Sequence, residues 1–362
     1  MRALRVGVIG CGAIAQVQHL PHLRDLDDQF AIGAICDRSR ELLKVVGDAY
    51  HVPPARRFTD ARELLASDLD AALICHAGAH APVAIAAAQA GKHVLVEKPA
   101  CSTVREAEAM VAAAELASVV LMIAYPKRHD PAYQYAQARV ASMDDVRFIQ
   151  VNHLHPDNAL HTAEFRIHVP RDLGADERAR WRAEEDALVR EALGRSTVPP
   201  PMATAFALVN GSLIHDLGNL HGMFGPPARV VSTEIWHEGR ALTTVLAYAS
   251  GARAVVSWVD LPDLWHFHET LEVYGRRERV LIAFPTGFSR GLPTQVTVEE
   301  IEGAGRPVAK HLSWHENPFK NELAHFGACI REGKTPLTPG REVVDDVALV
   351  RDIVLAYARK EP

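Results

Sequence analysis

The stretch Leu4-Arg5-Val6-Gly7-Val8-Ile9-Gly10-Cys11-Gly12-Ala13-Ile14-Ala15 stands near the start of the 362-residue sequence and decides the fold of its N-terminal part. Its apolar run Leu4–Ile9 predicts a buried strand, and the GxGxxA pattern directly after it opens a helix. In that context Gly10 permits a tight turn, and Gly12 lets a pyrophosphate approach the backbone at the helix N-terminus. We therefore expect a dinucleotide to bind at Gly10, Gly12, Ala13 and Ile14.

The second predicted strand, Phe30–Cys36, ends at Asp37. A carboxylate at this place accepts hydrogen bonds from the adenosine ribose and repels a 2′-phosphate, which favours NAD as the cofactor. The next residue, Arg38, could stack on adenine or pair with a 2′-phosphate, so NADP stays an alternative.

The rest of the first half alternates short apolar strands with helical stretches. Such near-continuous apolar strands predict a parallel sheet covered on both faces, which is a doubly wound (Rossmann) domain, here residues 1–125. The further strands expected are Ala71–Cys75, His93–Val96 and Val119–Tyr125, and the helices Ala61–Ala66, Pro82–Ala90 and Thr103–Leu116.

Residues 126–362 show a different pattern, which predicts an α+β domain with a large, mainly antiparallel sheet for substrate binding and oligomerisation. An exposed sheet face favours a homodimer or homotetramer. The charged stretch 171–195 predicts either a solvated surface helix before a Pro199–Pro201 linker or a lid over the site. The strands expected are Val146–Leu154, Arg229–Trp236, Leu242–Ala249, Ala252–Val259, Leu271–Gly275, Val280–Phe284 and Gln295–Ile301, and the helices Pro131–Ala141, Leu323–Ile330 and Val343–Tyr357.

Composition excludes several classes of protein. The net charge of −6 and the pI of about 6.3 argue against a nucleic-acid ligand. No apolar run reaches the ~18–20 residues that a membrane span needs, and nothing at the N-terminus resembles a signal peptide. The five cysteines have no CxxC spacing, so we expect a reduced, cytoplasmic protein without disulfides.

The string Gly91-Lys92-His93-Val94-Leu95-Val96-Glu97-Lys98-Pro99, together with the glycine-rich turn, resembles the glucose–fructose oxidoreductase / inositol dehydrogenase / rhizopine-catabolism (Gfo/Idh/MocA) family. That family carries Glu-Lys-Pro after the fifth strand of its nucleotide domain. The resemblance extends to Tyr125–Pro131 and to the C-terminal segments 321–326 and 338–340. It implies an NAD(P)-dependent oxidoreductase that moves hydride between nicotinamide and a secondary alcohol or ketone of a sugar, cyclitol or related polyol.

The resemblance also implies roles for single residues. Glu97 and Lys98 would lie at the nicotinamide end, where the Lys98 ammonium holds the substrate oxygen and relays its proton. Cys75 and His76 stand where the family usually has Thr-Pro, and His80 matches the family histidine near the cofactor.

The second family signature, Asp-x-Gly-x-His, is incomplete here. Asp216 and Gly218 are present, but Leu220 stands at the position of the usual acid/base histidine. On a helix His215 shares a face with Asn219, so we rank His215 first and His221 second as its replacement, with Asp216 as a further catalytic group.

Other polar side chains are candidates for binding a polyol. His153 and His155 alternate on one strand face, and the same spacing recurs at His266 and His268. We expect no metal, because no HExxH, CxxC or clustered carboxylate accompanies these histidines. The candidate substrate-binding residues are Tyr125, Lys127, Arg128, His153, His155 and Asn219.

Two other functions stay open. One is a redox-neutral enzyme, similar to a glycosidase or epimerase, that keeps tightly bound NAD through its cycle. The other is a regulator that binds the nucleotide without turnover.

Overall fold

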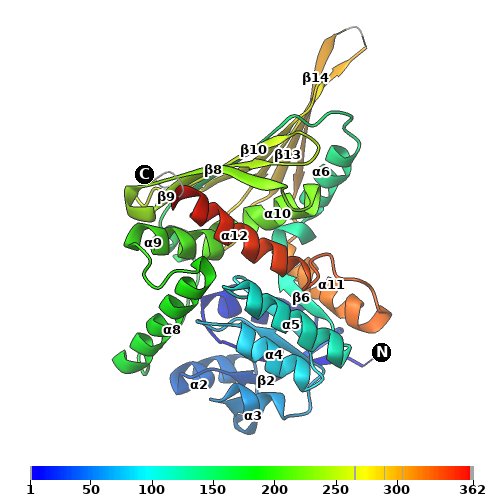
Figure 1. The fold of residues 1–362 in the computed structure, drawn as a ribbon. Helices are drawn as coiled ribbons and strands as arrows, with labels where there is room; N and C mark the ends of the chain where they lie inside the picture. Colours follow the sequence, from blue (N-terminus) through cyan, green and yellow to red (C-terminus); the bar gives the residue numbers. More distant parts are fainter. Residues whose placement is uncertain (1, 265, 289, 304, 359–362) are drawn as a thin grey trace. The chain divides into compact units, whose positions relative to one another are not determined.

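The structure is a computed structural model that describes residues 2–264, 266–288, 290–303 and 305–358 (Figure 1). The chain forms two compact units. Unit 1 comprises Met1–Pro126, Glu164–Ala192 and Phe319–Val347, and unit 2 comprises Lys127–Ala163, Leu193–Pro318 and Ala348–Pro362. The first segment of unit 1 ends one residue after the predicted boundary at 125. The sequence analysis assigned everything beyond that boundary to the second domain, whereas two later segments return to unit 1.

Unit 1 is built on a six-stranded parallel sheet with the order β3-β2-β1-β4-β5-β6. This is the doubly wound order, and the predicted fold class is confirmed. Strand order reverses between β1 and β4, so a ligand is expected at the carboxyl ends of those strands. The strands are β1 Leu4–Ile9, β2 Phe30–Cys36, β3 Arg57–Phe58, β4 Ala71–Ile74, β5 His93–Glu97 and β6 Leu121–Ala124. The helices are α1 Leu20–Asp25, α2 Arg40–Ala49, α3 Ala61–Leu65, α4 Ala81–Gln89 and α5 Val104–Ala117, with a π-helical turn at Ala15–His19 before α1.

The returning segments belong to unit 1 because their apolar faces complete its core. α11 (Pro318–Glu332) contributes Leu323 and Phe326, which are buried in the same cluster as Val8 and Leu73 of the sheet. Thr338 donates a hydrogen bond of 2.6 Å to the carbonyl of Ile123 in β6. α12 (Glu342–Ala358) comes next along the chain.

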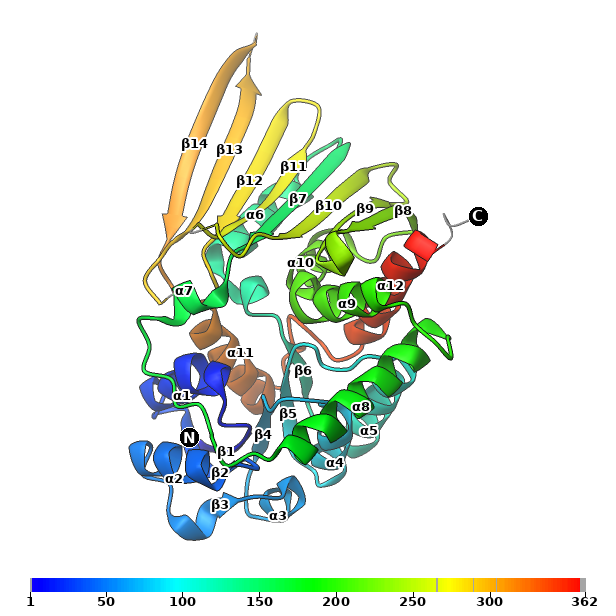
Figure 2. The ribbon, with the colours of Figure 1, turned by 90° about the vertical axis from the view of Figure 1, so that its left-hand side faces the viewer.

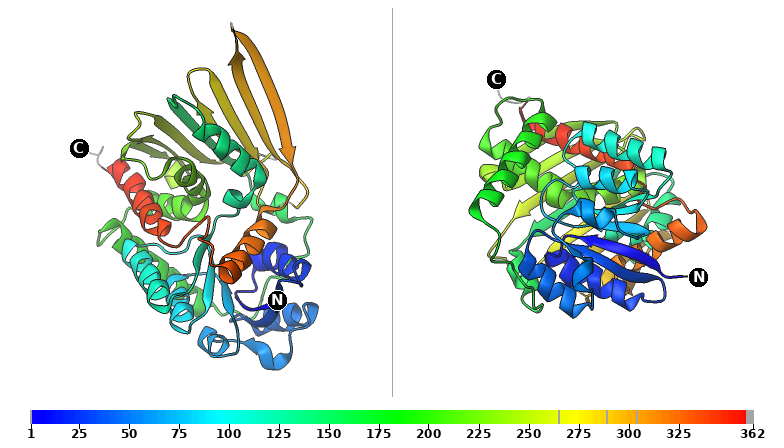
Figure 3. Two further views of the ribbon diagram at one scale, coloured as in Figure 1. Left: turned by 90° about the vertical axis from the view of Figure 1, so that its right-hand side faces the viewer. Right: turned by 90° about the horizontal axis from the view of Figure 1, so that it is seen from below.

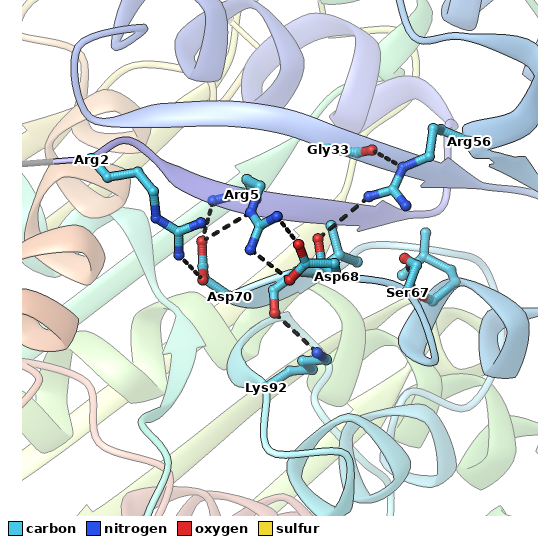
Figure 4. A network of polar contacts seen from close by, with 10 residues as sticks. Arg2, Arg5, Gly33, Arg56, Ser67, Asp68, Asp70 and Lys92 are labelled. Atoms are coloured by element: carbon cyan, nitrogen blue, oxygen red, sulfur yellow. Dashed lines mark hydrogen bonds and ion pairs between the residues drawn. The ribbon is translucent and has the colours of Figure 1, made fainter.

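The amino ends of the parallel strands carry a polar network (Figure 4). Asp70 accepts a hydrogen bond of 2.7 Å from the backbone N–H of Arg5 and another of 2.7 Å from the Arg2 guanidinium, and Arg5 also pairs with Asp68. Exposed pairs of this kind contribute about 0–1 kcal/mol each. They lie at the sheet edge opposite to the one where doubly wound folds bind ligands, so we assign them to the fold.

Unit 2 is built on an eight-stranded sheet with the order β14-β13-β12-β11-β7-β10-β9-β8 (Figure 2). Only the β10–β7 pair is parallel among the pairs of the described strands, so the predicted mainly antiparallel sheet is confirmed. The strands are β7 Phe148–His155, β8 Arg229–Trp236, β9 Ala241–Ala247, β10 Arg253–Asp260, β11 His268–Tyr274, β12 Glu278–Phe284, β13 Thr294–Glu302 and β14 Arg306–Trp314.

Two features of this sheet differ from the expectation. β14 was missed because its burial pattern has no fully buried position, so it carries no apolar alternation. β11 begins at His268, so His266 precedes the strand and the two do not alternate within it, while the neighbouring Trp265 lies outside the described residues.

The helices of unit 2 are α6 Pro131–Ala141, α7 Asn158–Thr162, α9 Pro200–Leu208 and α10 Ile214–Phe224, with a π-helical turn at Val209–Leu213 leading into α10. α6 and α10 lie on one face of the sheet (Figure 3). The expected linker Pro199–Pro201 instead starts α9, because proline has the backbone angle that a first helical turn needs. α8 (Ala175–Leu193) confirms the helix predicted within 171–195.

Candidate active site

The glycine-rich turn in unit 1 has the geometry of a phosphate-binding turn. Gly10 has φ +104°, and a Cβ added there would lie 2.3 Å from the backbone nitrogen of His76, so only glycine fits. At Gly12 the position of a Cβ has no atom within 4 Å among the described residues, which leaves the backbone approachable. Ala13 and Ile14 begin the helix. The Cys75 thiol lies 3.2 Å from the carbonyl oxygen of Gly10.

Asp37 braces this turn from the end of β2. Its Oδ2 accepts a hydrogen bond of 2.8 Å from the Cys11 N–H, and its Oδ1 accepts one of 2.8 Å from the Ser39 N–H. Burial raises the pKa of Asp37, although these two backbone donors oppose the shift. The carboxylate therefore lies where an adenosine ribose is expected. The neighbouring Arg38 pairs with Glu177 at 3.0 Å and lies over the Trp181 ring at 5.1 Å.

Glu97, the last residue of β5, holds the backbone that carries Lys98. Its Oε1 accepts a hydrogen bond of 2.8 Å from Nε2 of His19, and its Oε2 accepts one of 3.1 Å from the Lys98 N–H. Burial by itself would raise the pKa of Glu97, but the hydrogen bond and charge of His19 lower it overall. Glu97 is thus a buried anion, and it fixes the start of the Lys98 segment while the Lys98 side chain is half-buried.

His76 and His80 follow β4. The two ring nitrogens of His80 lie 2.9 Å from the Glu97 carbonyl oxygen and 2.6 Å from that of His76. His76 meets the His80 ring edge-on, and burial together with His80 lowers the pKa of His76 to about 4. His76 is therefore neutral at pH 7. His80 ties β4 to β5, and contact of either histidine with a cofactor stays a prediction.

The sequence analysis missed an acid beside Glu97. Glu322 of α11 is fully buried, and neither of its carboxyl oxygens has a hydrogen-bond partner among the described residues. Burial and the negative charge of Glu97 raise the pKa of Glu322 well above its ordinary value. A signal was available, because Glu322 has the helical spacing of Phe319, Leu323 and Phe326 and so lies on the apolar face of α11.

Replacement of Glu322 by glutamine is expected to flatten the pH dependence of stability. The folded acid keeps its proton above pH ~4.5 while the unfolded one releases it, so this residue reduces the free energy of unfolding as the pH rises. Between pH 5 and 8 the variant should lose about 1–3 kcal/mol less than the wild type in urea denaturation. The exposed Glu108→Gln serves as control, and equal slopes for wild type and Glu322→Gln would contradict the assignment.

Unit 2 holds a buried cluster of charged side chains at the centre of its sheet. Nδ1 of His153 in β7 lies 2.8 Å from Oδ2 of Asp216 in α10. Glu269 of β11 forms an ion pair with Lys127, and Nδ1 of His153 lies 3.9 Å from its Oε2. His153, Asp216 and Glu269 are all buried.

This cluster corrects one premise of the sequence analysis. Carboxylates do accompany His153, since one ligand atom each of His153, Asp216 and Glu269 lies within 4.8 Å of the others. These residues could hold a metal ion. The ammonium of Lys127 already supplies a positive charge at Glu269, so the cluster is balanced by the protein itself. The expectation of no metal stays a prediction.

The two carboxyl groups of the cluster share their protons unequally. Burial and the charge of Asp216 raise the pKa of Glu269 to about 7, although Lys127 and His153 oppose the shift. For Asp216, burial would raise the pKa, but the charge and hydrogen bond of His153 lower it. The pair therefore titrates as one unit near neutral pH, as a group that exchanges protons in a reaction must.

A second histidine extends the cluster. Nε2 of His153 lies 3.1 Å from Nδ1 of His155, which confirms that both rings lie on one face of β7. When His153 donates its Nδ1 proton to Asp216, its Nε2 accepts from His155. His155 is half-buried, stacks on Trp258 at 5.4 Å and meets Phe267 edge-on. Burial lowers the pKa of His155 to about 4, so it is neutral at pH 7.

The other candidates on α10 are dispersed around the helix. His215 and His221 are half-buried, whereas Asn219 and Leu220 are buried. Neither amide atom of Asn219 has a hydrogen-bond partner among the described residues, although its backbone carbonyl accepts a bond of 2.7 Å from the Tyr133 hydroxyl. A catalytic role for His215 or His221 stays a prediction.

The remaining candidates lie in the chain segment 125–128. The Tyr125 hydroxyl donates a hydrogen bond of 2.9 Å to Asp346, and both residues are buried. Arg128 is buried beside α10, where a Cβ added to Gly222 would lie 2.7 Å from its Nε. Lys127 lies over the Phe284 ring as well as beside Glu269. Their contact with a substrate stays a prediction.

Comparison with known proteins identifies the family. Residues 4–125 match the family described as "Oxidoreductase family, NAD-binding Rossmann fold" (Gfo/Idh/MocA). The chain is 26% identical to D-apiose dehydrogenase of Paraburkholderia graminis over 98% of its length and 88% of that protein. It is 23% identical to myo-inositol 2-dehydrogenase of Thermotoga maritima over 99% and 96% of the two chains. The chain belongs to the Gfo/Idh/MocA oxidoreductase family.

Other Gfo/Idh/MocA matches are shorter or more distant. The putative oxidoreductase YceM of Salmonella typhimurium is 31% identical, over 41% of this chain and 47% of that protein. The solved structure of aldose-aldose oxidoreductase from Caulobacter crescentus, complexed with glycerol, has the same fold, with a TM-score of 0.73 over 99% of both chains and 21% identity. Like its family, this chain is an NAD(P)-dependent oxidoreductase. Among its described helices, none has the length and apolar character needed to span a membrane.

Proposed function

We propose that this Gfo/Idh/MocA protein transfers hydride between NAD and a secondary alcohol or ketone of a sugar, cyclitol or related polyol. The observation that carries the proposal is the pair Glu97–Lys98 at the carboxyl end of β5, in the same parallel sheet as the glycine-rich turn. The relatives that align over nearly the whole chain are named for oxidation of a branched sugar and of a cyclitol, which supports this substrate class.

The residues of unit 1 fit a dinucleotide. Gly10 and Gly12 leave the backbone of the turn open, and Asp37 presents a carboxylate at the end of β2. NAD, when bound, supplies the nicotinamide that accepts or donates hydride. The other residues proposed to contact it are Ala13, Ile14, Arg38, Cys75, His76, His80, Glu97 and Lys98, and NADP is the alternative cofactor.

Lys98 would hold and orient the substrate oxygen. Its backbone is fixed by Glu97, which in turn is held by His19, so the ammonium extends from a rigid strand end. A cation at this oxygen favours the alkoxide that forms as hydride leaves, and the amine can carry the released proton.

Asp216 and His153 would exchange that proton with solvent, in place of the family histidine that Leu220 replaces. Asp216 keeps its motif position, and the chain from Asp216 through His153 to His155 joins a buried carboxylate to a half-buried ring. His215 and His221 are the alternative bases. Tyr125, Lys127, Arg128 and Asn219 are the further residues proposed to bind or position a polyol.

Assembly and location are further parts of the proposal. A homodimer or homotetramer through the large sheet of unit 2 would cover apolar side chains that are exposed on its strands, such as Val231 and Ile301. A reduced cytoplasmic setting agrees with five cysteines that are all free and buried.

One observation favours a second function. Leucine at position 220 removes the usual acid/base, which suits an enzyme that reduces and reoxidises tightly bound NAD within one cycle, or a regulator without turnover.

Absorbance at the reduced-nicotinamide band tests the proposal directly. Purified protein is mixed with NAD or NADP and a panel of inositols, aldoses, amino sugars and glycosides. We expect NADH to form with one polyol class, because the relatives and the site both indicate dehydrogenation. Product formation without net NADH, with nucleotide retained through purification, would support the redox-neutral enzyme. Nucleotide binding with no product at all would support the regulator.

A further inference from the structure

Residues 164–192, here called the strap, are tied by polar contacts to the nucleotide-binding edge of their own unit (Figure 2). At one end the side chain of Gln16, next to the glycine-rich turn, exchanges two hydrogen bonds with the backbone of His168, at 2.8 and 3.0 Å. At the other end Arg105 of α5 pairs with Glu191 at 2.7 Å. Between these points the strap reaches the turn that joins β2 to α2.

Asp172 of the strap occupies the N-terminus of α2. Its Oδ1 accepts a hydrogen bond of 2.6 Å from the Ser39 hydroxyl, and its Oδ2 accepts one of 3.1 Å from the Glu41 N–H. Ser39 is the N-cap of α2, a helix of 10 residues, so its hydroxyl and the first free N–H groups form a place that suits an anion. The protein places its own carboxylate there.

Carboxylates also hold the other donors of this turn. Asp37 accepts from the backbone N–H of Ser39, and Glu177 of the strap pairs with the guanidinium of Arg38, which lies over Trp181. The sequence Asp37-Arg38-Ser39-Arg40 would otherwise offer a cation, a hydroxyl and a helix N-terminus at the very position where a 2′-phosphate is bound in dinucleotide folds. Asp37 alone does not remove those donors.

We propose that Asp172 is a specificity-determining residue, which selects NAD over NADP by occupying the donors that the 2′-phosphate would need. A phosphate and a carboxylate compete for the same hydroxyl and N–H groups, and with Asp172 in place the phosphate also meets its negative charge. Glu177 assists by holding Arg38. The inference rests on the proposed function, whose cofactor choice it assigns to a segment more than 130 residues from the motif.

Direct binding of NADH and NADPH tests this without any substrate. Dissociation constants are measured by calorimetry for the wild type, Asp172→Asn and the double variant Asp172→Asn/Glu177→Gln. Asp186→Asn is the matched control, because it removes the same charge from an exposed position of α8. We expect wild type and control to prefer NADH. In Asp172→Asn the ratio of the two constants should move about tenfold or more toward NADPH, and further in the double variant.

The ratio of the constants separates the outcomes. Loosening of the strap without a specific role would weaken both nucleotides equally and leave the ratio within twofold of the wild type, which would overturn the inference. Protein that binds NADH, shifts its ratio as expected and yet oxidises no polyol would uphold the inference and contradict the proposed dehydrogenase. Wild-type protein that binds neither nucleotide would overturn both.

Discussion

Replacement of Lys98 by alanine is expected to lower turnover about 100-fold or more, with the affinity for NAD nearly unchanged. The side chain would be lost, but the backbone at this position is held by Glu97, which His19 anchors in turn. The nucleotide turn at Gly10 and Asp37 does not depend on the ammonium. Turnover is followed by NADH absorbance with the polyol that the panel identifies, and NADH affinity is followed by calorimetry.

The matched control for this experiment is Lys44→Ala, an exposed lysine of α2 that pairs with Asp48 at 2.7 Å. It should retain the wild-type rate. Turnover of Lys98→Ala within threefold of the wild type would contradict the proposed role, and a parallel loss of NADH affinity would assign Lys98 to cofactor binding instead.

Replacement of Asp216 by asparagine is expected to reduce turnover by a similar factor and to move the pH profile. Asparagine keeps the shape but removes the buried charge that raises the pKa of Glu269 to about 7. The proton held near neutral pH is then released at lower pH, so a limb of the profile that depends on this cluster should shift to the acidic side. Rates between pH 5 and 9 measure the shift, and the exposed Asp263→Asn is the control.

A companion series decides which histidine works with Asp216. His153→Gln should reduce turnover about as much as Asp216→Asn, and the double variant should be little worse than either, because residues that act as one unit are not additive. His215→Gln should stay within tenfold of the wild type. The reverse order would transfer the proton to His215, as the spacing on the helix first suggested. An unchanged pH profile in Asp216→Asn would exclude the cluster from the rate.

The nucleotide half of this protein was largely predictable from short stretches. The strand Leu4–Ile9, the turn at Gly10 and the acid Asp37 lie close together in sequence, and backbone sterics with hydrogen bonding set their geometry locally. Most predicted strand and helix bounds in both halves lie within a few residues of those observed. The strand β14 was missed because a strand that buries neither face has no apolar period to detect.

The candidate site in unit 2 was only half predictable. The motif Asp-x-Gly indicated Asp216, but its partners His153 and Glu269 come from strands that are adjacent only in the folded sheet, where β7 pairs with β11. Periodicity placed His153 and His155 on one face of a strand. It could not say that a carboxylate from a helix 63 residues away would meet them.

The sequence by itself determined the doubly wound sheet, the nucleotide turn, the Glu97–Lys98 position and the absence of the motif histidine at Leu220, because each depends on neighbours within about 30 residues. Only the tertiary structure decided that Asp216 pairs with His153, that Glu322 is buried beside Glu97, and that Asp172 caps α2. Electrostatic pairing acts through space over a few ångströms, while loop closure brings distant residues together at a cost that depends only weakly on chain length. Such contacts therefore leave no period or spacing in the sequence.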